Sequence, residues 1–354
     1  MKILHVITSL RTGGAEKLLV DLLPAFKSMG HTVELLLFDG TVTPFYTQLN
    51  ESSITIHHLG MGNNVYNPIN IFKLKRYINE FDIIHTHNTA CQYYTAIAKV
   101  VFKSNCKLFT TEHSTNNRRR NFKLFKYTDK FIYKQYQSII SVSNKTTLNL
   151  RKHIELSLPI KTIYNGIDTT KYYNIPREFK KGDKIIVTMI AAFRHEKDHD
   201  TLVRAFSTLP QNYNLWLIGQ GPRQQEIKAM VYNLGISNRV IFTDFVENIP
   251  KALHMSHIVV LSSHWEGFGL AALEGMASNL PVIVSDIDGI REVVGSSAVL
   301  FKPHDHIDLA NKIIELCVNP KMYHVYSEAG LNRSYEFDIK ITAQKYANLY
   351  TTNA

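Results

Sequence analysis

The clearest local pattern in the chain is Ile258-Val259-Val260-Leu261-Ser262-Ser263-His264-Trp265-Glu266-Gly267-Phe268-Gly269-Leu270-Ala271-Ala272-Leu273-Glu274. Its first four residues form a continuous apolar run, as expected for a strand that is buried on both faces. Gly267 and Gly269 then mark a tight turn, and a helix is predicted to start at Leu270. A buried strand that passes through a glycine turn into a helix is typical of a parallel α/β sheet.

The same alternation of apolar runs and helical patterns extends over the rest of the chain. In the first half, strands are predicted at Lys2–Thr8, Thr32–Leu37, Ile54–His58, Ile83–His85, Lys107–Thr111 and Ser138–Val142. In the second half, they are predicted at Lys184–Ile190, Asn214–Ile218, Val240–Phe242, Ile258–Leu261 and Pro281–Ser285. Helical patterns separate them, among them Glu16–Met29, Asp200–Ser207, Gln224–Leu234, Leu270–Ala277 and Ile307–Val318. The sequence therefore predicts an α/β protein with two Rossmann-like, doubly wound parallel sheets.

The length of 354 residues exceeds what one hydrophobic core usually organises, so two domains are expected. The first domain is predicted at residues 1–170 and the second at 184–335, with a linker at 171–183. The linker contains the polar segment Pro176–Asp183, which holds both proline and glycine. Residues 336–354 are predicted to add a terminal helix. Two similar α/β halves imply a ligand cleft between them, at the carboxyl ends of the strands.

The chain carries a formal net charge of +10. A basic balance fits nucleic acid, an anionic membrane surface or phosphorylated substrates, and no nucleic-acid-binding motif accompanies the charge. The run Arg118–Tyr127 places Arg118, Arg119 and Arg120 beside aromatic residues, a mixture that suits a membrane interface or a lipid phosphate. A solvated loop that leads into a helix explains the same run equally well.

The number and spacing of the cysteines, and the length of the apolar runs, indicate the cellular compartment in which the protein is expected. The three cysteines lack a C-x-x-C spacing, which excludes a disulfide framework and favours a reducing compartment. No stretch reaches the roughly 18 apolar residues that a membrane-spanning helix needs. The apolar start Met1–Ile7 is short and leads into a glycine turn, so it is interpreted as a first strand and not as a signal peptide. We expect a cytoplasmic protein that can lie on the inner face of the cell membrane.

The two glutamates of the opening stretch are the strongest candidates for ligand binding. Glu266 and Glu274 are eight residues apart, about 80° out of phase on an ideal helix, so they do not line one helical face. Glu266 is therefore assigned to the loop and Glu274 to the first turns of the helix. Gly267 and Gly269 leave amides open at a helix N-terminus, a natural seat for phosphate, and the carboxylates can accept hydrogen bonds from sugar or ribose hydroxyls. The alternative is two exposed glutamates around a turn.

A second glycine turn follows the first predicted strand. Gly13 and Gly14 stand between that strand and a helix, where backbone can approach an anionic ligand. The turn is neither G-x-G-x-x-G nor a Walker loop, so it indicates neither nicotinamide nor ATP binding. By itself the pattern fits a bare tight turn as well as a binding site.

These segments together resemble glycosyltransferase family 4, whose members have the GT-B fold and retain the anomeric configuration of the transferred sugar. Glu266 and Glu274 match the E-x7-E motif of that family. Further matching segments follow in the family's order: Gly13–Glu16, Asp82–His87, Ile140–Ser143, Asn165–Asp168, Ala191–Asp198, Ile218–Pro222 and Glu266–Pro281. The resemblance covers nearly the whole chain. It implies an acceptor-binding first domain, a donor-binding second domain, and a last helix at about Ile339–Tyr350 that packs back on the first domain.

The resemblance also implies roles for single residues on the donor side. Glu274 would hold the ribose hydroxyls, and Lys197 would neutralise the diphosphate. Glu266 would hold the donor sugar and its phosphates together with the backbone of three residues: Phe268, Gly269 and Leu270. Gly14 and Gly219 are also assigned to the donor, and Gly13 to the acceptor.

One position departs from the family pattern. The family commonly carries a second cation where this chain has Ala192. Arg194 lies two positions on, and in an extended backbone residues i and i+2 point the same way, so Arg194 could reach the same phosphates. His113 follows a predicted strand at a point where family members often place a histidine, near the reacting sugar and the acceptor. Glu266, Arg194, Lys197 and His113 are the candidate catalytic residues, with no protein nucleophile assigned.

The implied reaction needs a UDP- or GDP-sugar donor and no metal, because Arg194, Lys197 and a helix N-terminus can neutralise the leaving diphosphate. The implied acceptor is a glycan on a polyprenyl-diphosphate carrier, in the synthesis of capsule, lipopolysaccharide or another surface polysaccharide. Two other activities stay open at this point. A nucleotide-sugar 2-epimerase shares the architecture and turns over without an acceptor. A metal-dependent hydrolase would use three imidazole ligands for zinc: His85, His87 and His113.

Overall fold

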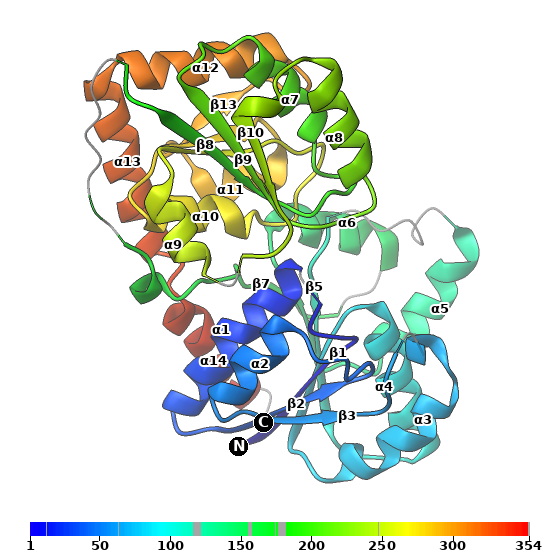
Figure 1. The fold of residues 1–354 in the computed structure, drawn as a ribbon. Helices are drawn as coiled ribbons and strands as arrows, with labels where there is room; N and C mark the ends of the chain where they lie inside the picture. The colour runs from blue at the N-terminus through cyan, green and yellow to red at the C-terminus, as the bar shows by residue number, and fades with distance from the viewer. Residues whose placement is uncertain are drawn as a thin grey trace. The chain divides into compact units, whose positions relative to one another are not determined.

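A computed structural model describes residues 1–11, 13–62, 64–115, 122–154, 158–173, 175, 182–246 and 248–352. The chain forms two compact units (Figure 1). Unit 1 consists of Met1–Gly166 together with Ile339–Ala354, and unit 2 consists of Ile167–Asp338. The chain therefore leaves unit 1 once and returns to it for its last helix.

Unit 1 is built on a sheet of seven parallel strands in the order β3-β2-β1-β4-β5-β6-β7. The strands are β1 (Lys2–Ile7), β2 (Thr32–Leu37), β3 (Thr55–His58), β4 (Ile83–His87), β5 (Lys107–Glu112), β6 (Ser138–Ser141) and β7 (Ile160–Thr162). The helices are α1 (Gly14–Ser28), α2 (Pro44–Glu51), α3 (Ile69–Lys73), α4 (Thr89–Val101), α5 (Lys123–Tyr133), α6 (Asn144–Ile154) and α14 (Ile339–Thr352), with 3₁₀ turns at Asn64–Tyr66 and Leu74–Asn79. The order reverses between β1 and β4, which is the switch point where ligands of such sheets bind.

Alternation along the central strand β1 creates a core on each face of this sheet. Ile3 and Ile7 pack with the apolar sides of α1 and α14. Leu4 and Val6 point to the other face, where they pack with residues of α4 and of the 3₁₀ turn Leu74–Asn79. Because successive side chains of a strand point to opposite faces, a continuous apolar run is what a sheet covered on both sides requires.

The last helix, α14, belongs to the core of unit 1. It lies beside α1, red against blue in Figure 1. Tyr346 and Tyr350 are fully buried, and the ring of Tyr350 stacks on Phe26 of α1 with centroids 5.9 Å apart.

Unit 2 is built on six parallel strands in the order β10-β9-β8-β11-β12-β13. The strands are β8 (Ile185–Ile190), β9 (Tyr213–Ile218), β10 (Val240–Thr243), β11 (Ile258–Leu261), β12 (Val282–Ser285) and β13 (Val299–Phe301). The helices are α7 (His199–Ser207), α8 (Gln224–Asn233), α9 (Ile249–Met255), α10 (Leu270–Ala277), α11 (Asp288–Val294), α12 (His306–Val318) and α13 (Pro320–Tyr335). Here the switch point lies between β8 and β11.

The predicted α/β class with two doubly wound parallel sheets is confirmed. The start of unit 2 differs from the predicted boundary, because the segment Ile167–Tyr172 belongs to unit 2. The Ile167 amide donates to the carbonyl of Phe337 (3.0 Å), and the buried Tyr172 hydroxyl donates to Glu274 (2.9 Å). Residues 176–181 of the predicted linker lie outside the described residues.

Candidate active site

The switch point of unit 2 holds an ion pair between the loops that follow β8 and β11. The backbone of Lys197 bridges to Ser263, which brings the two loops together. The Lys197 ammonium forms an ion pair with Oε2 of Glu266, and Oε1 of the same carboxylate accepts a hydrogen bond from the Gly267 amide (3.0 Å). The two charged side chains are 19% and 14% exposed, so solvent screens the pair only in part. A cation and a carboxylate therefore meet where open α/β sheets bind ligands.

The N-terminus of α10 follows directly on this ion pair. Gly269 is the N-cap residue and has a φ of +90°, a left-handed conformation that favours glycine. No side chain caps the helix among the described residues, so the amides of its first turn are available to a ligand. A helix N-terminus also carries a partial positive charge, which favours an anion. The uncapped N-terminus fits the phosphate seat predicted at Gly269 and Leu270, and that assignment stays a prediction.

Glu274 lies on α10 itself, in a different environment from Glu266. Its residue is only 4% exposed, and its Oε1 accepts a hydrogen bond from the Tyr172 hydroxyl (2.9 Å). Buried carboxylates need such partners, because desolvation without a hydrogen bond is costly. Tyr172 was not among the predicted site residues. It is 102 positions away in the chain, and no local pattern marks it.

Arg194 does not sit as the extended-backbone argument requires. Its amide donates to the carbonyl of Ala192 (2.8 Å), and the Lys197 amide donates to the carbonyl of Arg194 (3.0 Å). The segment is therefore a tight turn, in which residues i and i+2 do not share a direction. The guanidinium is 58% exposed, and its Nη1 lies 3.9 Å from Oε1 of Glu196. The premise that placed Arg194 beside Lys197 is wrong, and a role for Arg194 at the diphosphate stays a prediction.

Two glycines hold the loops of this site against each other. A Cβ on Gly219 would lie 2.1 Å from the carbonyl oxygen of Ala191, so only glycine lets the loops after β8 and β9 approach this closely. A Cβ on Gly289, in α11, would lie 2.2 Å from the carbonyl oxygen of Glu266. Gly219 was predicted as a donor residue, and the structure gives it this packing contact. Gly289 was not predicted, although it supports the Glu266 loop directly.

The switch point of unit 1 borders a cavity of about 340 Å³. Its lining comes from the carboxyl ends of β1, β4 and β5 and from neighbouring loops, and includes Thr8, Tyr66, Asn88, Gln92, Glu112 and His113. The side-chain amide of Asn88 donates to the Thr8 hydroxyl (3.0 Å), and this bond links the loops after β4 and β1. Gly13 and Gly14 begin α1 at the same edge, and Gly13 has an extended φ of −174°. The cavity is polar and contains His113, the candidate predicted from the sequence.

His113 is the half-buried outer member of a row of histidines whose other members, His87 and His5, are fully buried. Its Nε2 lies 2.9 Å from Nδ1 of His87, and Nε2 of His87 lies 3.0 Å from Nδ1 of His5. Burial lowers the pKa of His5 to about 3 and that of His113 to about 4, and it lowers the pKa of His87 well below its usual value. These imidazoles are therefore neutral at pH 7 and can donate or accept a hydrogen bond without carrying charge.

The structure does not assemble the three ligands that the hydrolase alternative required. The histidines whose ligand atoms converge are His5, His85 and His87, without His113. Both ring nitrogens of His85 lie within hydrogen-bond distance of a hydroxyl group. Nδ1 faces the Tyr350 hydroxyl, and Nε2 lies 2.8 Å from the Thr111 hydroxyl. Both ring nitrogens of His85 are thus occupied by hydrogen bonds within the core of unit 1.

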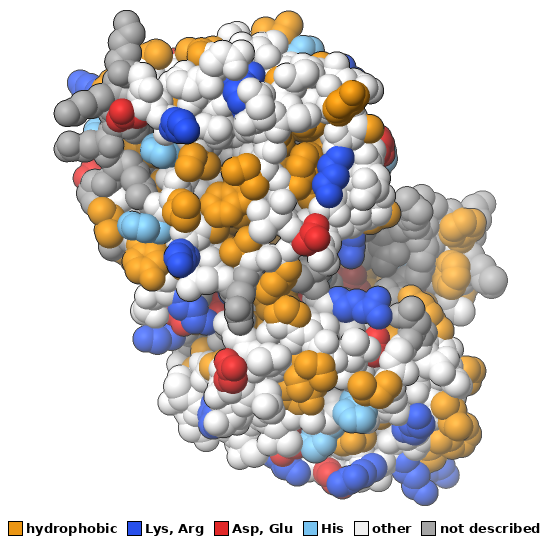
Figure 2. All heavy atoms as spheres, in the orientation of Figure 1, with side chains coloured by type: hydrophobic (Ala, Val, Ile, Leu, Met, Phe, Trp, Pro, Cys, Tyr) orange, Lys and Arg blue, Asp and Glu red, His pale blue; other side chains and the backbone are white. Residues whose placement is uncertain are grey.

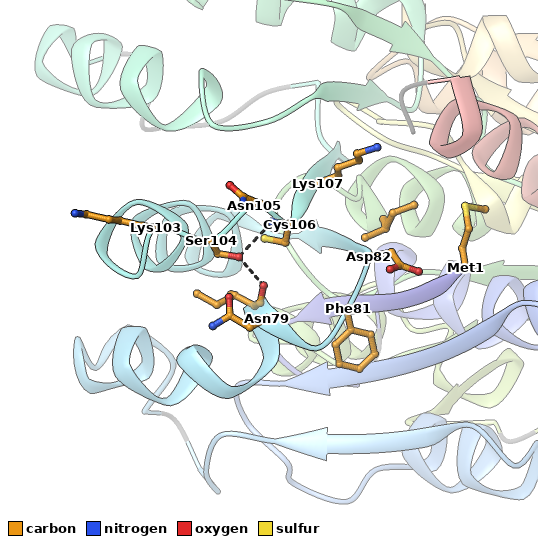
Figure 3. Close-up of a pocket in the computed structure, with 11 residues that line it drawn as sticks. Met1, Asn79, Phe81, Asp82, Lys103, Ser104, Asn105, Cys106 and Lys107 are labelled. Carbon is orange, nitrogen blue, oxygen red and sulfur yellow. Dashed lines mark hydrogen bonds between the residues drawn. The ribbon is translucent and has the colours of Figure 1, made fainter.

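A larger cavity of about 600 Å³ lies at the opposite edge of the same sheet (Figure 3). It is lined by Asp82, Lys103, Ser104 and Cys106, among others, near the amino ends of β4 and β5. The Ser104 hydroxyl donates to the carbonyl of Ile78 (2.7 Å) and accepts from the Cys106 amide (3.2 Å), so it closes a turn. Because ligands of open α/β sheets bind at the carboxyl ends of strands, we do not assign the active site to this cavity.

Arg118, Arg119 and Arg120, predicted to contact acceptor or membrane, lie outside the described residues. The described part of the same run carries exposed aromatic side chains: Phe122, Phe125 and Tyr127 are 62%, 39% and 73% exposed. None of the described helices is long and apolar enough to cross a bilayer.

Two doubly wound parallel sheets, the second with an uncapped helix N-terminus at its switch point, are the elements of the GT-B fold. Family comparison agrees: the model "Glycosyltransferase Family 4" matches residues 12–171, and the model "Glycosyl transferases group 1" matches residues 173–333. Together the two matches span nearly the whole chain. The chain belongs to glycosyltransferase family 4.

Individual relatives fit this assignment. The N-acetyl-alpha-D-glucosaminyl L-malate synthase of Bacillus anthracis is 28% identical over 287 residues, covering 77% of this chain and 74% of the relative. The O-antigen biosynthesis glycosyltransferase WclY of Escherichia coli is 23% identical over 380 residues, covering 99% of this chain and 98% of the relative. A crystal structure of Anabaena Alr3699/HepE in complex with UDP and glucose superposes with a TM-score of 0.86 at 22% identity. The match covers 99% of this chain and 100% of that structure's chain. Of the activities left open by the sequence, the comparisons support glycosyl transfer.

Proposed function

We propose that this protein is a retaining glycosyltransferase that moves a sugar from a nucleotide-diphosphate sugar to a glycan or lipid-linked acceptor in surface polysaccharide synthesis. The observation that carries the proposal is the arrangement at the switch point of unit 2. There the ion pair of Lys197 with Glu266 stands next to the uncapped N-terminus of α10, with Glu274 buried on the same helix.

The chemistry of glycosyl transfer matches these groups. As the bond to the sugar breaks, negative charge develops on the departing diphosphate and positive charge on the sugar. Lys197 and the first amides of α10 are fixed donors for the diphosphate, and preorganised donors of this kind supply much of the stabilisation of a transition state. The Glu266 carboxylate can accept hydrogen bonds from donor sugar hydroxyls. With Lys197 and the helix N-terminus at the leaving group, transfer does not need a metal ion.

The donor is proposed to be a UDP- or GDP-sugar, with Glu274 holding the ribose hydroxyls. Its carboxylate is oriented by Tyr172, and a fixed carboxylate can accept two hydroxyl hydrogen bonds with little loss of side-chain entropy. The complex of the structural neighbour with UDP and glucose supports a nucleotide-sugar donor here.

The acceptor is proposed to bind at the polar cavity of unit 1, beside His113. A neutral imidazole can accept a proton or a hydrogen bond from an acceptor hydroxyl, and burial keeps His113 neutral. The cavity of about 340 Å³ falls in the range of small-ligand pockets. The WclY relative, matched over almost its full length, acts in O-antigen biosynthesis, which supports an acceptor from surface polysaccharide synthesis.

Access to a lipid-linked acceptor calls for contact with a membrane surface. Apolar and basic side chains are mixed over α3 and α4 (Figure 2). Tyr66, Ile69 and Phe72 are 73%, 51% and 65% exposed. The exposed Lys75 lies over the ring of Phe102, which contacts Phe72. Aromatic side chains with adjacent cations suit the headgroup region of an anionic bilayer. We propose that this surface and the Arg118–Tyr127 run hold the protein on the inner face of the cell membrane.

The membrane part is tested by co-sedimentation with anionic phospholipid vesicles. Replacing Arg118, Arg119 and Arg120 by Ser should reduce the bound fraction at low salt, with neutral vesicles as the control. Unchanged binding to anionic vesicles would discard this part of the proposal and leave the transferase activity untouched.

The function itself is tested with a panel of UDP- and GDP-sugars. A ligand raises the melting temperature according to the logarithm of its saturation, so a thermal-shift screen should single out the donor. That donor, labelled in its sugar, is then incubated with polyprenyl-diphosphate-linked glycans, with and without EDTA. Transfer that survives EDTA and gives a product with the anomeric configuration of the donor, read from its ¹H NMR coupling, is expected. An inverted product, or transfer that EDTA abolishes and only Mg²⁺ or Mn²⁺ restores, would contradict the mechanism.

A further inference from the structure

Three potential metal ligands outside the assigned donor residues meet at one point of unit 2. They are Asp198, His264 and His304, whose ligand atoms all lie within 4.8 Å of one another. Each residue comes from a different loop: Asp198 follows β8, His264 follows β11 and His304 follows β13. The cluster therefore lies at the carboxyl edge of the sheet, where three separate segments converge.

The spacing of the ligand atoms fits a small divalent ion. Oδ2 of Asp198 lies 3.7 Å from Nδ1 of His264 and 3.5 Å from Nδ1 of His304. In a tetrahedral zinc site with bonds of 2.0–2.1 Å, ligand atoms stand about 3.3 Å apart. The carboxylate oxygen and each of the two imidazole nitrogens would need to approach by only a few tenths of an ångström. The two imidazole rings already stack, with centroids 4.7 Å apart.

The carboxylate of the cluster is held in place by its own helix. Asp198 is the N-cap of α7, and its Oδ1 accepts from the Thr201 amide (3.1 Å). Its Oδ2, the oxygen that faces the histidines, accepts from the Thr201 hydroxyl (2.6 Å). The carboxylate is 4% exposed. Hydrogen bonds that orient a ligand in this way are typical of metal sites, where the groups behind the ligands strengthen binding.

Both histidines have an unusual feature that a bound ion would explain. Nδ1 of His264 is buried and has no hydrogen-bond partner among the residues that the structure describes. Buried polar atoms are rarely left unpaired, because the lost hydrogen bond with water is not replaced. His304 has a φ of +65°, a left-handed conformation that strains a residue with a Cβ. Its side chain is 66% exposed, which gives an ion access from solvent.

We propose that Asp198, His264 and His304 form a binding site for one divalent transition ion of the zinc class. Two imidazoles and one carboxylate are the ligands that zinc accepts readily, whereas Mg²⁺ prefers oxygen alone. Asp198 directly follows Lys197, and His264 stands two residues before Glu266. The ion thus joins the loops that carry the Lys197–Glu266 pair, and its role is to stabilise unit 2 and not to take part in sugar transfer.

The test is calorimetric titration of the untagged full chain with ZnCl₂, after treatment with EDTA and its removal. One equivalent of Zn²⁺ should bind with a Kd below about 100 µM, and MgCl₂ should give no binding at the same concentrations. At a free concentration of 100 times its Kd, Zn²⁺ should raise the melting temperature of unit 2 by roughly 5–10 °C. Absence of Zn²⁺ binding at millimolar concentration, or equal binding of Mg²⁺, would overturn the proposal.

His304→Gly is the decisive variant, because glycine removes the ligand and also relieves the left-handed strain. The variant should fold at least as well as the wild type and bind Zn²⁺ at least about tenfold more weakly. His324→Ala, which removes an exposed histidine of α13 far along the chain from the cluster, should bind Zn²⁺ like the wild type. Unchanged binding by His304→Gly would place the ion elsewhere, for example at the histidines of unit 1, and would contradict the proposal.

Discussion

The two sheets of this protein carry different chemistry at the same place in the fold. At the carboxyl edge of unit 1, the buried His5 and His87 and the half-buried His113 form a row of neutral imidazoles beside a polar cavity. At the carboxyl edge of unit 2, Lys197 and Glu266 form a partly exposed ion pair at an uncapped helix N-terminus. The scaffold is shared, and the side chains at the switch point decide what each edge can bind.

Burial accounts for the difference in charge. In unit 1, rings from two neighbouring strands stack under α14, and no solvent reaches them to stabilise a charged imidazole. In unit 2, the charged groups pair with each other and keep some exposure, which lowers the cost of placing them there. A row of neutral imidazoles suits a sugar hydroxyl, whereas a cation and backbone amides suit a diphosphate. The comparison is strengthened or broken by the following experiments.

The largest effect is expected from Lys197→Ala in unit 2. Without the ammonium, the leaving diphosphate loses a fixed positive charge, and kcat/KM should fall about 100- to 1000-fold. The measurement is steady-state transfer with the donor identified by the thermal-shift screen. Lys321→Ala, at an exposed position of α13, serves as the control and should keep wild-type kinetics. A loss of less than threefold for Lys197→Ala would remove the ion pair from the mechanism.

The next largest effect is a loss of stability of unit 1 when the pH is lowered. The folded pKa of His113 is about 4 and that of His5 about 3, both below the value of 6.5 in the unfolded chain. Below pH 6.5 the unfolded state therefore binds more protons than the folded state, and stability falls as the pH is lowered towards the folded pKa. Between pH 7 and pH 5, each of the two histidines should cost about 2 kcal/mol of unfolding free energy.

Urea unfolding at pH 7 and pH 5 measures this loss, and His113→Asn provides the comparison. The variant lacks one titrating group but keeps a polar side chain, so its loss of stability on acidification should be about 2 kcal/mol smaller than that of the wild type. Equal losses in the two proteins would show that His113 is not a buried neutral imidazole.

A smaller effect is expected from Tyr172→Phe in unit 2. The change removes the hydrogen bond to Glu274, and a hydrogen bond to a charged group contributes about 1.5 kcal/mol or somewhat more. Affinity for the nucleotide sugar should fall roughly tenfold, as measured by calorimetric titration. Tyr173→Phe, whose residue is 47% exposed, is the matched control. If both variants bind the donor like the wild type, Tyr172 does not orient Glu274 for binding.

Local sequence patterns predicted most of the sheet structure. The apolar run of β11, the glycine turn and α10 follow from adjacent residues, and the structure has β11 at Ile258–Leu261 and α10 at Leu270–Ala277, as predicted. The strands β7 (Ile160–Thr162) and β13 (Val299–Phe301) were not predicted. Three residues are too few to show an alternation that separates a strand from a loop.

Contacts between distant segments could not be predicted in the same way. His5 and His85 stand opposite each other because β1 pairs with β4 in parallel register, which no single stretch of sequence reveals. The bond from Tyr172 to Glu274 joins residues 102 positions apart. The turn at Arg194 was not predicted either. It is closed by a hydrogen bond from the Arg194 amide to the carbonyl of Ala192, and such backbone groups leave no mark in the sequence.

Calorimetric binding to Glu274→Gln tests the division of labour in unit 2 most directly. Gln can still accept the Tyr172 hydrogen bond, so the fold should be retained while the negative charge proposed to hold the ribose is lost. The affinity for UDP or GDP, whichever the wild type binds, should fall at least about tenfold, while affinity for inorganic diphosphate stays unchanged. Equal affinity of wild type and variant for the nucleoside diphosphate would contradict the account.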